Sequence, residues 1–105
     1  MGILEEVLGR NARLIVLETF LKNRGKITYL SGLAEETGLS HSSVSRVIEE
    51  LVRTGIVEKE PLGKQTNIFR LDEGNKLTQL MIRFYGDLED LQRGIEKMKP
   101  RVSLN

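Results

Sequence analysis

Apolar residues recur three or four positions apart in several segments of the chain, a spacing that predicts amphipathic helices. The segment 12–23 has this pattern and follows Asn11, a residue that commonly caps the start of a helix. The segment 41–54 follows Ser40 and precedes Gly55, so it carries typical start and stop residues at its two ends. The apolar residues of 41–54 fall on one stripe: Val44, Val47, Ile48 and Leu51. Both segments are therefore expected to be helices that pack against a core.

Shorter elements are predicted around these two helices. The segment 3–8 reads as a short amphipathic helix that ends near Gly9. Residues 27–30, with the sequence ITYL, are β-branched and aromatic, and they predict a small strand. Ser31 then caps a short helix that is stopped by Gly38, because glycine takes the left-handed conformation of a turn at no steric cost.

A β-hairpin is predicted after the helix 41–54. Residues 56–60 alternate as in a strand, residues 68–71 form a second strand-like run, and the polar segment 61–67 between them contains Pro, Gly and Asn. The expected order is helix, strand, helix, helix, hairpin. The predicted fold class is thus mainly α with a small β-hairpin (α+β).

The C-terminal part of the chain has a heptad pattern. After the helix-breaking residues 72–76, apolar residues alternate four and three positions apart, which is typical of a helix that pairs with another helix. These residues are Leu77, Met81, Phe84, Leu88, Leu91, Ile95 and Met98. The pattern predicts a helix over 77–99 that Pro100 ends, followed by a loosely ordered tail, 100–105. Such a stripe would expose a large apolar patch, so we expect a homodimer, with parallel or antiparallel packing left open.

Composition excludes several classes of function. The chain has 105 residues, enough for one small domain and one extra element. It has no Cys, which excludes disulfides and thiolate metal sites and suits a reducing cytoplasm. A single His, no Gly-rich phosphate loop and no clustered carboxylates predict no enzyme, no cofactor and no metal. No apolar run approaches the roughly 18 residues that span a membrane, and the first residues lack the features of a signal peptide.

The segment Leu30–Leu71 resembles the winged helix-turn-helix of MarR- and ArsR-type transcriptional regulators. The similarity runs through LSGLAEETGLSHSSVSRVIEELVRTGIVEKE, and Leu8–Leu21 (LGRNARLIVLETFL) is similar to the first helix of ArsR-like and related archaeal regulators. The resemblance implies a winged helix-turn-helix DNA-binding domain over 1–71. Residues 72–76 would then be a linker, and 77–99 a coiled-coil-like dimerisation helix.

In this resemblance the helix 41–54 is the recognition helix, which enters the major groove of DNA with its N-terminus first. Small hydroxyl side chains let a phosphate backbone approach closely, and the helix N-terminus favours the phosphate charge. Glu49 and Glu50 would repel DNA, so the N-terminal half of the helix is the expected reading face. The candidate DNA-binding residues are Ser40, His41, Ser42, Ser43, Ser45 and Arg46. The plainer alternative is that the serines only cap the helix and that Arg46 is a solvated surface residue.

The hairpin corresponds to the wing, whose tip reaches a minor groove or phosphates in the regulators that it resembles. Lys64 matches the usual basic position at the tip. The candidate DNA-binding residues of the wing are Lys59, Lys64, Gln65, Thr66, Asn67 and Arg70. The alternative is an ordinary solvated hairpin.

The formal net charge is only +1, so bulk charge gives no argument for nucleic acid and the positions of the charges must carry it. We expect a sequence-specific regulator of transcription that binds double-stranded DNA as a homodimer, located in the cytoplasm with the nucleoid. Two alternatives stay open: an architectural DNA binder without sequence preference, and a winged-helix module that binds proteins. A small-molecule effector is compatible with this fold, but no residue indicates one.

Overall fold

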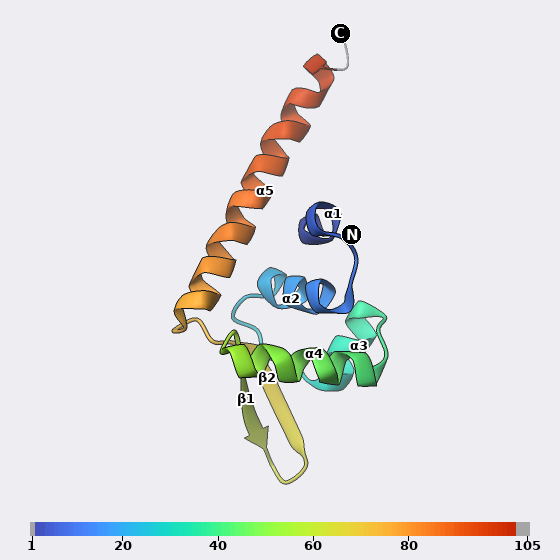
Figure 1. Ribbon diagram of the computed structural model, residues 1–105, viewed down its shortest axis with the longest axis vertical. Coiled ribbons are helices and arrows are strands. Elements are labelled where there is room, and N and C mark those ends of the chain that lie inside the picture. Colours follow the sequence, from blue (N-terminus) through green and yellow to red (C-terminus); the bar gives the residue numbers. More distant parts are fainter. Residues whose placement is uncertain (1, 103–105) are drawn as a thin grey trace.

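Five helices and one hairpin make up the part of the chain that the computed structural model describes, residues 2–102, with side chains described for residues 2–94. In chain order they are α1 (Ile3–Leu8), α2 (Ala12–Lys22), α3 (Leu30–Thr37), α4 (His41–Thr54), β1 (Val57–Leu62), β2 (Thr66–Leu71) and α5 (Lys76–Val102). Helices α2, α3 and α4 pack together, the hairpin extends from one side of them, and α5 extends from the other (Figure 1). The predicted fold class, mainly α with a small β-hairpin, is confirmed.

Helix α4 lies at the centre of the core. Its predicted apolar stripe is buried, with Val44 fully covered, and the helix contacts α2, α3 and β1. Ala34 of α3 is also buried, and its small side chain lets α3 and α4 approach each other closely. The other elements contribute Val16, Leu17, Phe20, Leu21, Leu33, Ile56, Val57, Phe69 and Leu71 to the same core.

The helix ends follow the sequence pattern closely. The Asn11 Oδ1 accepts a hydrogen bond from the Leu14 N–H at 2.9 Å, and the Ser40 Oγ accepts one from the Ser43 N–H at 3.2 Å. Gly55 ends α4 in the left-handed conformation, with φ of 88°, and the Ile56 N–H donates back to the Leu51 carbonyl. These predictions needed only local interactions, and they are confirmed.

The prediction for residues 27–30 was wrong. The structure has only one bridge there, in which Thr28 exchanges two backbone hydrogen bonds of 2.9 Å with Phe69 of β2. Helix α3 begins at Leu30 and not after Ser31, with Tyr29 at its N-cap and no side-chain cap bond. Leu30 packs against the core, which turns the chain into the helix before a strand can lengthen.

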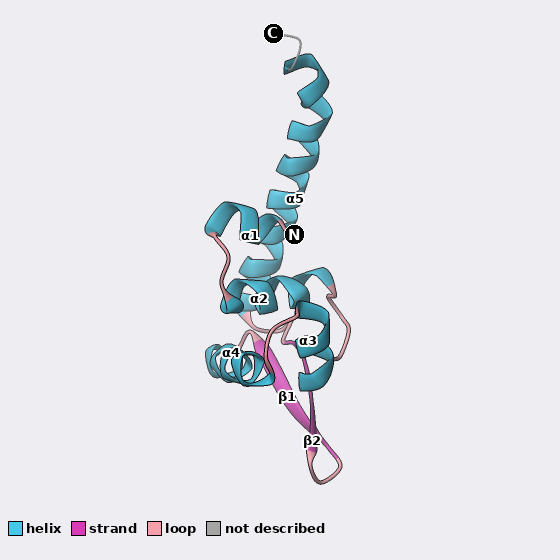
Figure 2. Cartoon of the chain, turned by 90° about the vertical axis from the view of Figure 1, so that its right-hand side faces the viewer, coloured by secondary structure: helices cyan, strands magenta, loops and turns pink. Residues whose placement is uncertain are grey.

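The hairpin turn is tighter than predicted. The two strands pair antiparallel from Val57 with Leu71 to Leu62 with Thr66, so Pro61 and Leu62 belong to β1 and not to the turn. A two-stranded sheet leaves one edge of each strand in water, where the missing N–H of a proline costs little. The wing is therefore longer and narrower than its sequence pattern indicated (Figure 2).

Helix α5 is longer than predicted at both ends. It starts at Lys76 and continues through Pro100 to Val102, so the proline does not end it. Asn75 caps the helix, because its Oδ1 accepts from the N–H groups of Leu77 (2.8 Å) and Thr78 (3.2 Å). Of the expected tail, 100–105, residues 100–102 belong to this helix, and 103–105 lie outside the described residues. None of the described helices is long and apolar enough to cross a membrane.

The first turns of α5 are bonded to the corner that follows α4. Thr78 is fully buried, and its hydroxyl donates to the Ile56 carbonyl at 3.2 Å. Further along, α5 packs against α1 and α2 through Met81, Ile82 and Tyr85. The base of α5 is therefore fixed to the helix that carries the candidate DNA-binding residues.

A buried carboxylate joins α1, α2 and α5. Glu18 of α2 is 4% exposed and accepts a hydrogen bond from the Leu4 N–H at 3.3 Å. Tyr85 of α5 is 5% exposed, and burial together with a hydrogen bond to Glu18 raises its pKa well above the usual range. No sequence pattern predicted this contact, because its three members are far apart along the chain.

The pKa of Tyr85 predicts a loss of stability in alkali. The unfolded chain releases the phenol proton near pH 10, whereas the folded chain retains it, so the free energy of unfolding should fall as pH rises above about 10. The slope should reach at most about 1.4 kcal/mol per pH unit. Urea unfolding at several pH values should show this slope in the wild type and lose it in Tyr85→Phe. Tyr29→Phe, which removes the exposed phenol, should keep it; equal slopes in all three proteins would contradict the assignment.

Candidate nucleic-acid interface

The burial of the α4 stripe leaves the opposite side of this helix facing water. A helix turns about 100° per residue, so the side chains on the side opposite the buried stripe point outward. The exposed side chains on this outward face are Ser42, Arg46, Glu49 and Arg53. His41 is exposed at the start of the helix, while Ser43 and Ser45 are half-buried on its flanks. The N-terminal half of α4 therefore presents hydroxyls, one imidazole and Arg46 on one surface.

The serines at the start of α4 are bonded to one another. The Ser40 hydroxyl donates to the Ser43 hydroxyl at 3.0 Å, and it lies 3.2 Å from the Ser42 hydroxyl. Both interpretations of these residues are thus compatible with the structure. Ser40 caps the helix, and the exposed hydroxyl of Ser42 stands beside the positive end of the helix dipole.

Ion pairs engage some of the described cations, while others, in several elements, form none. Three arginines outside α4 and the wing are paired with carboxylates: Arg10 with Glu5, Arg13 with Glu50, and Arg24 with Glu73. Among the side chains of residues 2–94, four cations of α4 and the wing form no ion pair: Arg46, Arg53, Lys59 and Lys64. The near-zero net charge therefore does not exclude a DNA-binding surface, because these four cations are not held by a carboxylate of the protein.

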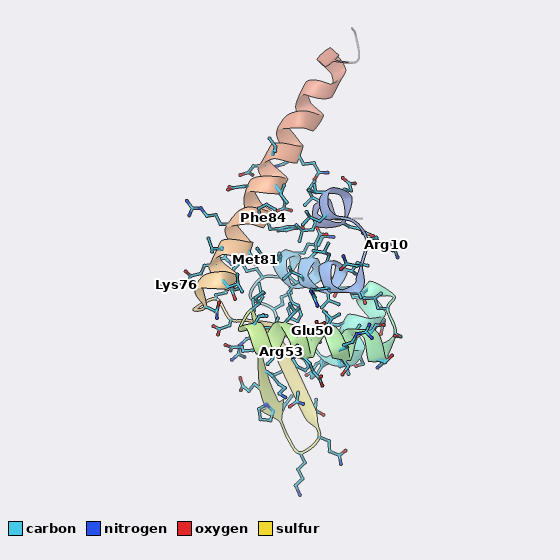
Figure 3. All side chains as sticks on the ribbon, in the orientation of Figure 1. Arg10, Glu50, Arg53, Lys76, Met81 and Phe84 are labelled. Carbon is cyan, nitrogen blue, oxygen red and sulfur yellow. The ribbon has the colours of Figure 1, made fainter. Side chains whose placement is uncertain are left out.

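A groove separates α4 from the wing. It has a volume of about 660 Å³ and is open to solvent. Its walls include Ser45, Glu49 and Arg53 from α4, and Lys59 and Gln65 from the hairpin. Half of the recognition-helix and wing candidates thus face a common concave surface: His41, Ser45, Lys59, Gln65, Thr66 and Asn67. Figure 3 shows Arg53 on α4 close to the hairpin.

Arg70 differs from the other wing candidates. Its Nε donates to the Glu58 carboxylate at 2.6 Å and its Nη2 to the Glu60 carboxylate at 2.9 Å, both across the hairpin. The bond to Glu58, followed by that to Glu60, raises the pKa of Arg70 above its usual value. The structure therefore places Arg70 at the base of the wing within its own network. Lys64 stands at the exposed tip beside Gly63.

A model of the MarR family matches residues 11–65, which is more than half of the chain. The chain belongs to the MarR family. This family and fold are those of transcription regulators and not of enzymes, so the protein is a winged-helix DNA-binding regulator. No curated protein matches the sequence.

Solved structures share the fold of this MarR-family protein. The Staphylococcus aureus MepR–DNA complex has a TM-score of 0.67 at 14% identity, over 96% of this chain and 81% of that chain. AF1382 from Archaeoglobus fulgidus has a TM-score of 0.58 at 27% identity, over 81% of this chain and 96% of that one. Sso10a-2, a DNA-binding protein from Sulfolobus solfataricus, has a TM-score of 0.58 at 13% identity, over 90% and 94%. Such low identities show the fold and not the ligand.

Arg53 and Tyr29 line the groove but were not among the predicted site residues. Arg53 lies seven residues after Arg46, two helical turns along the outward face, and that spacing was the signal for it. Tyr29 is 47% exposed and lines the groove next to α4. No local pattern indicated its position, because Tyr29 reaches the groove only through the bridge between Thr28 and β2.

The two adjacent glutamates of α4, expected to lie together beyond the reading face, lie in different places. Glu50 points to α2, where Arg13 binds it (Figure 3). Glu49 remains exposed on the outward face and lines the groove. The backbone spacing of 100° between neighbours on a helix explains the difference.

Arg46→Ala should weaken DNA binding by about 5- to 150-fold, because it removes an exposed cation from the outward face of α4. Arg13→Ala is the matched control, since this arginine is engaged with Glu50, and it should change the affinity by less than about threefold. Fluorescence anisotropy with a labelled duplex measures both. Equal losses in the two variants would show that Arg46 has no special place in the interface.

Proposed function

We propose that this MarR-family protein is a sequence-specific regulator of transcription that binds double-stranded DNA as a homodimer. In this proposal α4 enters the major groove, and the wing lies on the adjacent minor groove or the phosphate backbone. The observation that supports it is that four cations of α4 and the wing form no ion pair among the side chains of residues 2–94, and that two of them, Arg53 and Lys59, line the groove between these elements. Unpaired cations are free to replace the counterions of DNA.

In this proposal some residues of α4 contact phosphates and position the protein on DNA, and others contact base edges. Ser42 and His41 are exposed beside the helix N-terminus and suit phosphate contacts, which fix the register of the protein on DNA. Ser43 and Ser45 are half-buried and would approach the backbone from the flanks. Arg46 projects from the middle of the outward face, where a guanidinium can reach a guanine edge.

The wing residues suit contacts with the backbone. Lys64, Gln65, Thr66 and Asn67 are all exposed at or next to the tip, and Lys59 lines the groove. Arg70 contributes differently, because Glu58 and Glu60 already occupy its guanidinium. In the proposal Arg70 stiffens the base of the wing and does not contact DNA.

Dimerisation through α5 is supported by apolar side chains that the protomer leaves exposed. Leu77, Phe84 and Leu91 of the predicted seam are 41%, 40% and 63% exposed, and Leu80 beside them is 58% exposed. Met81 and Leu88 are partly covered by the protomer's own core, so fewer residues of the predicted seam are available to a second copy than the sequence pattern indicated. The side chains of Ile95 and Met98 lie outside the described residues. A row of exposed leucines and a phenylalanine along one helix is typical of an interface.

Helix α1 enlarges this apolar surface. Val7 and Leu8 are each 53% exposed, and α1 packs beside α5, where Gln92 reaches Glu6. A second copy that covered α5 would therefore cover part of α1. A two-fold dimer would present two copies of α4 to one face of DNA, with half-sites about 34–36 Å apart.

A binding selection from a random pool of duplexes, at near-physiological salt, tests the proposed function. We expect enrichment of a pseudo-palindrome, whose half-site spacing would report the separation of the two α4 helices. Absence of any enriched sequence would overturn sequence specificity. The residual affinity and its salt dependence would then separate an architectural DNA binder, with a steep dependence, from a module that binds proteins.

Leu91→Glu should convert the dimer to a monomer, because a carboxylate would replace the most exposed leucine of the seam. Sedimentation equilibrium measures the change, and far-UV circular dichroism checks that the helices remain. Arg83→Glu is the control, since it places the same charge on an exposed polar position of α5. A Leu91→Glu protein that sediments as the wild type would overturn dimerisation through this face.

A further inference from the structure

Glu49 occupies the centre of the outward face of α4. It follows Arg46 by three residues and precedes Arg53 by four, so the three side chains project from the same side of the helix. All three are exposed, and Glu49 also lines the groove between α4 and the wing. A duplex that receives the outward face of α4 in its major groove therefore meets the carboxylate of Glu49.

No protein side chain neutralises this carboxylate within the side chains described, residues 2–94. Arg53 is four residues away on the same face, yet the two form no ion pair, while the neighbouring Glu50 is bound by Arg13. A free carboxylate on a surface that approaches phosphates lowers the affinity for every DNA sequence. That loss is offset only where a base offers a hydrogen-bond donor to it.

The groups that each base exposes in the major groove determine which base can donate a hydrogen bond to Glu49. A carboxylate only accepts hydrogen bonds. Guanine presents two acceptors there and thymine presents an acceptor and a methyl group, so both are unfavourable. Adenine presents a donor beside an acceptor. Cytosine presents its N4 amino group alone, which makes it the best partner for a glutamate.

Resting on the proposed function, we propose that Glu49 is a specificity-determining residue that selects cytosine at one position of each half-site. Its carboxylate accepts a hydrogen bond from the cytosine N4 amino group. Arg46 and Arg53, on either side, suit the guanines of neighbouring base pairs. The carboxylate of Glu49 also weakens binding to unrelated DNA, so it increases the ratio of specific to non-specific affinity.

The test is the binding selection repeated with Glu49→Gln and Glu50→Gln. Glutamine has the same shape without the charge, and its amide also donates hydrogen bonds, so cytosine is no longer preferred. Glu49→Gln should reduce the preference for cytosine at one half-site position by about tenfold and should bind an unrelated duplex more tightly than the wild type. Glu50→Gln is the matched control one residue away and should keep the wild-type sequence preference. Circular dichroism checks the fold of both variants.

Each outcome has one meaning. An enriched site for the wild type that Glu49→Gln changes only at a single cytosine supports the inference. An enriched site that Glu49→Gln leaves unchanged, even with tighter binding to all duplexes, overturns the inference while the proposed function stands. No enriched site for the wild type overturns both. A change shared by Glu49→Gln and Glu50→Gln shows a general effect of charge and also overturns the role of Glu49.

Discussion

The rotational setting of α4 depends on four buried apolar side chains, and the candidate interface depends on that setting. Val44, Val47, Ile48 and Leu51 are held by α2, α3 and β1, so the helix cannot turn about its axis without exposing them. Burial of each side chain stabilises the fold by roughly 1.5–3 kcal/mol. This packing, and not any interaction among the polar residues, directs Arg46 and Glu49 toward the same surface.

Electrostatic pairing then decides which charges remain available on that surface. The ion pair between Arg13 and Glu50 links α2 to the flank of α4, and the bonds of Arg70 to two glutamates brace the wing. Surface pairs of this kind contribute little to the stability of a fold, because water and salt screen them. Their larger effect is on the distribution of charge. Paired side chains neutralise each other, whereas the cations of α4 and the wing that form no pair remain available.

The sequence predicted features that depend on local interactions. The caps of α2 and α4, the glycine that ends α4 and the hairpin follow from residue types at short spacing. Features that depend on distant contacts were not predictable in this way. Leu30 starts α3 early because it packs on the core, and Glu18 meets Tyr85 only after α5 has docked. Of the candidate site, the outward face of α4 could be predicted from periodicity, whereas the pairing of Arg70 and the position of Tyr29 required the register of the hairpin.

The anchoring of α5 at its base makes this helix a lever. Among the side chains of residues 2–94, Leu88 is the last apolar one of α5 that packs on the core, and α5 continues from there to Val102, about 20 Å at 1.5 Å per residue. A tilt of about 10° at the anchored part moves the free end by about 3.5 Å, close to the rise of one base pair. Small changes in packing around Leu88 would therefore produce larger displacements at the end of α5. The position of the end of α5 therefore depends on the packing of the part of the helix that contacts the core.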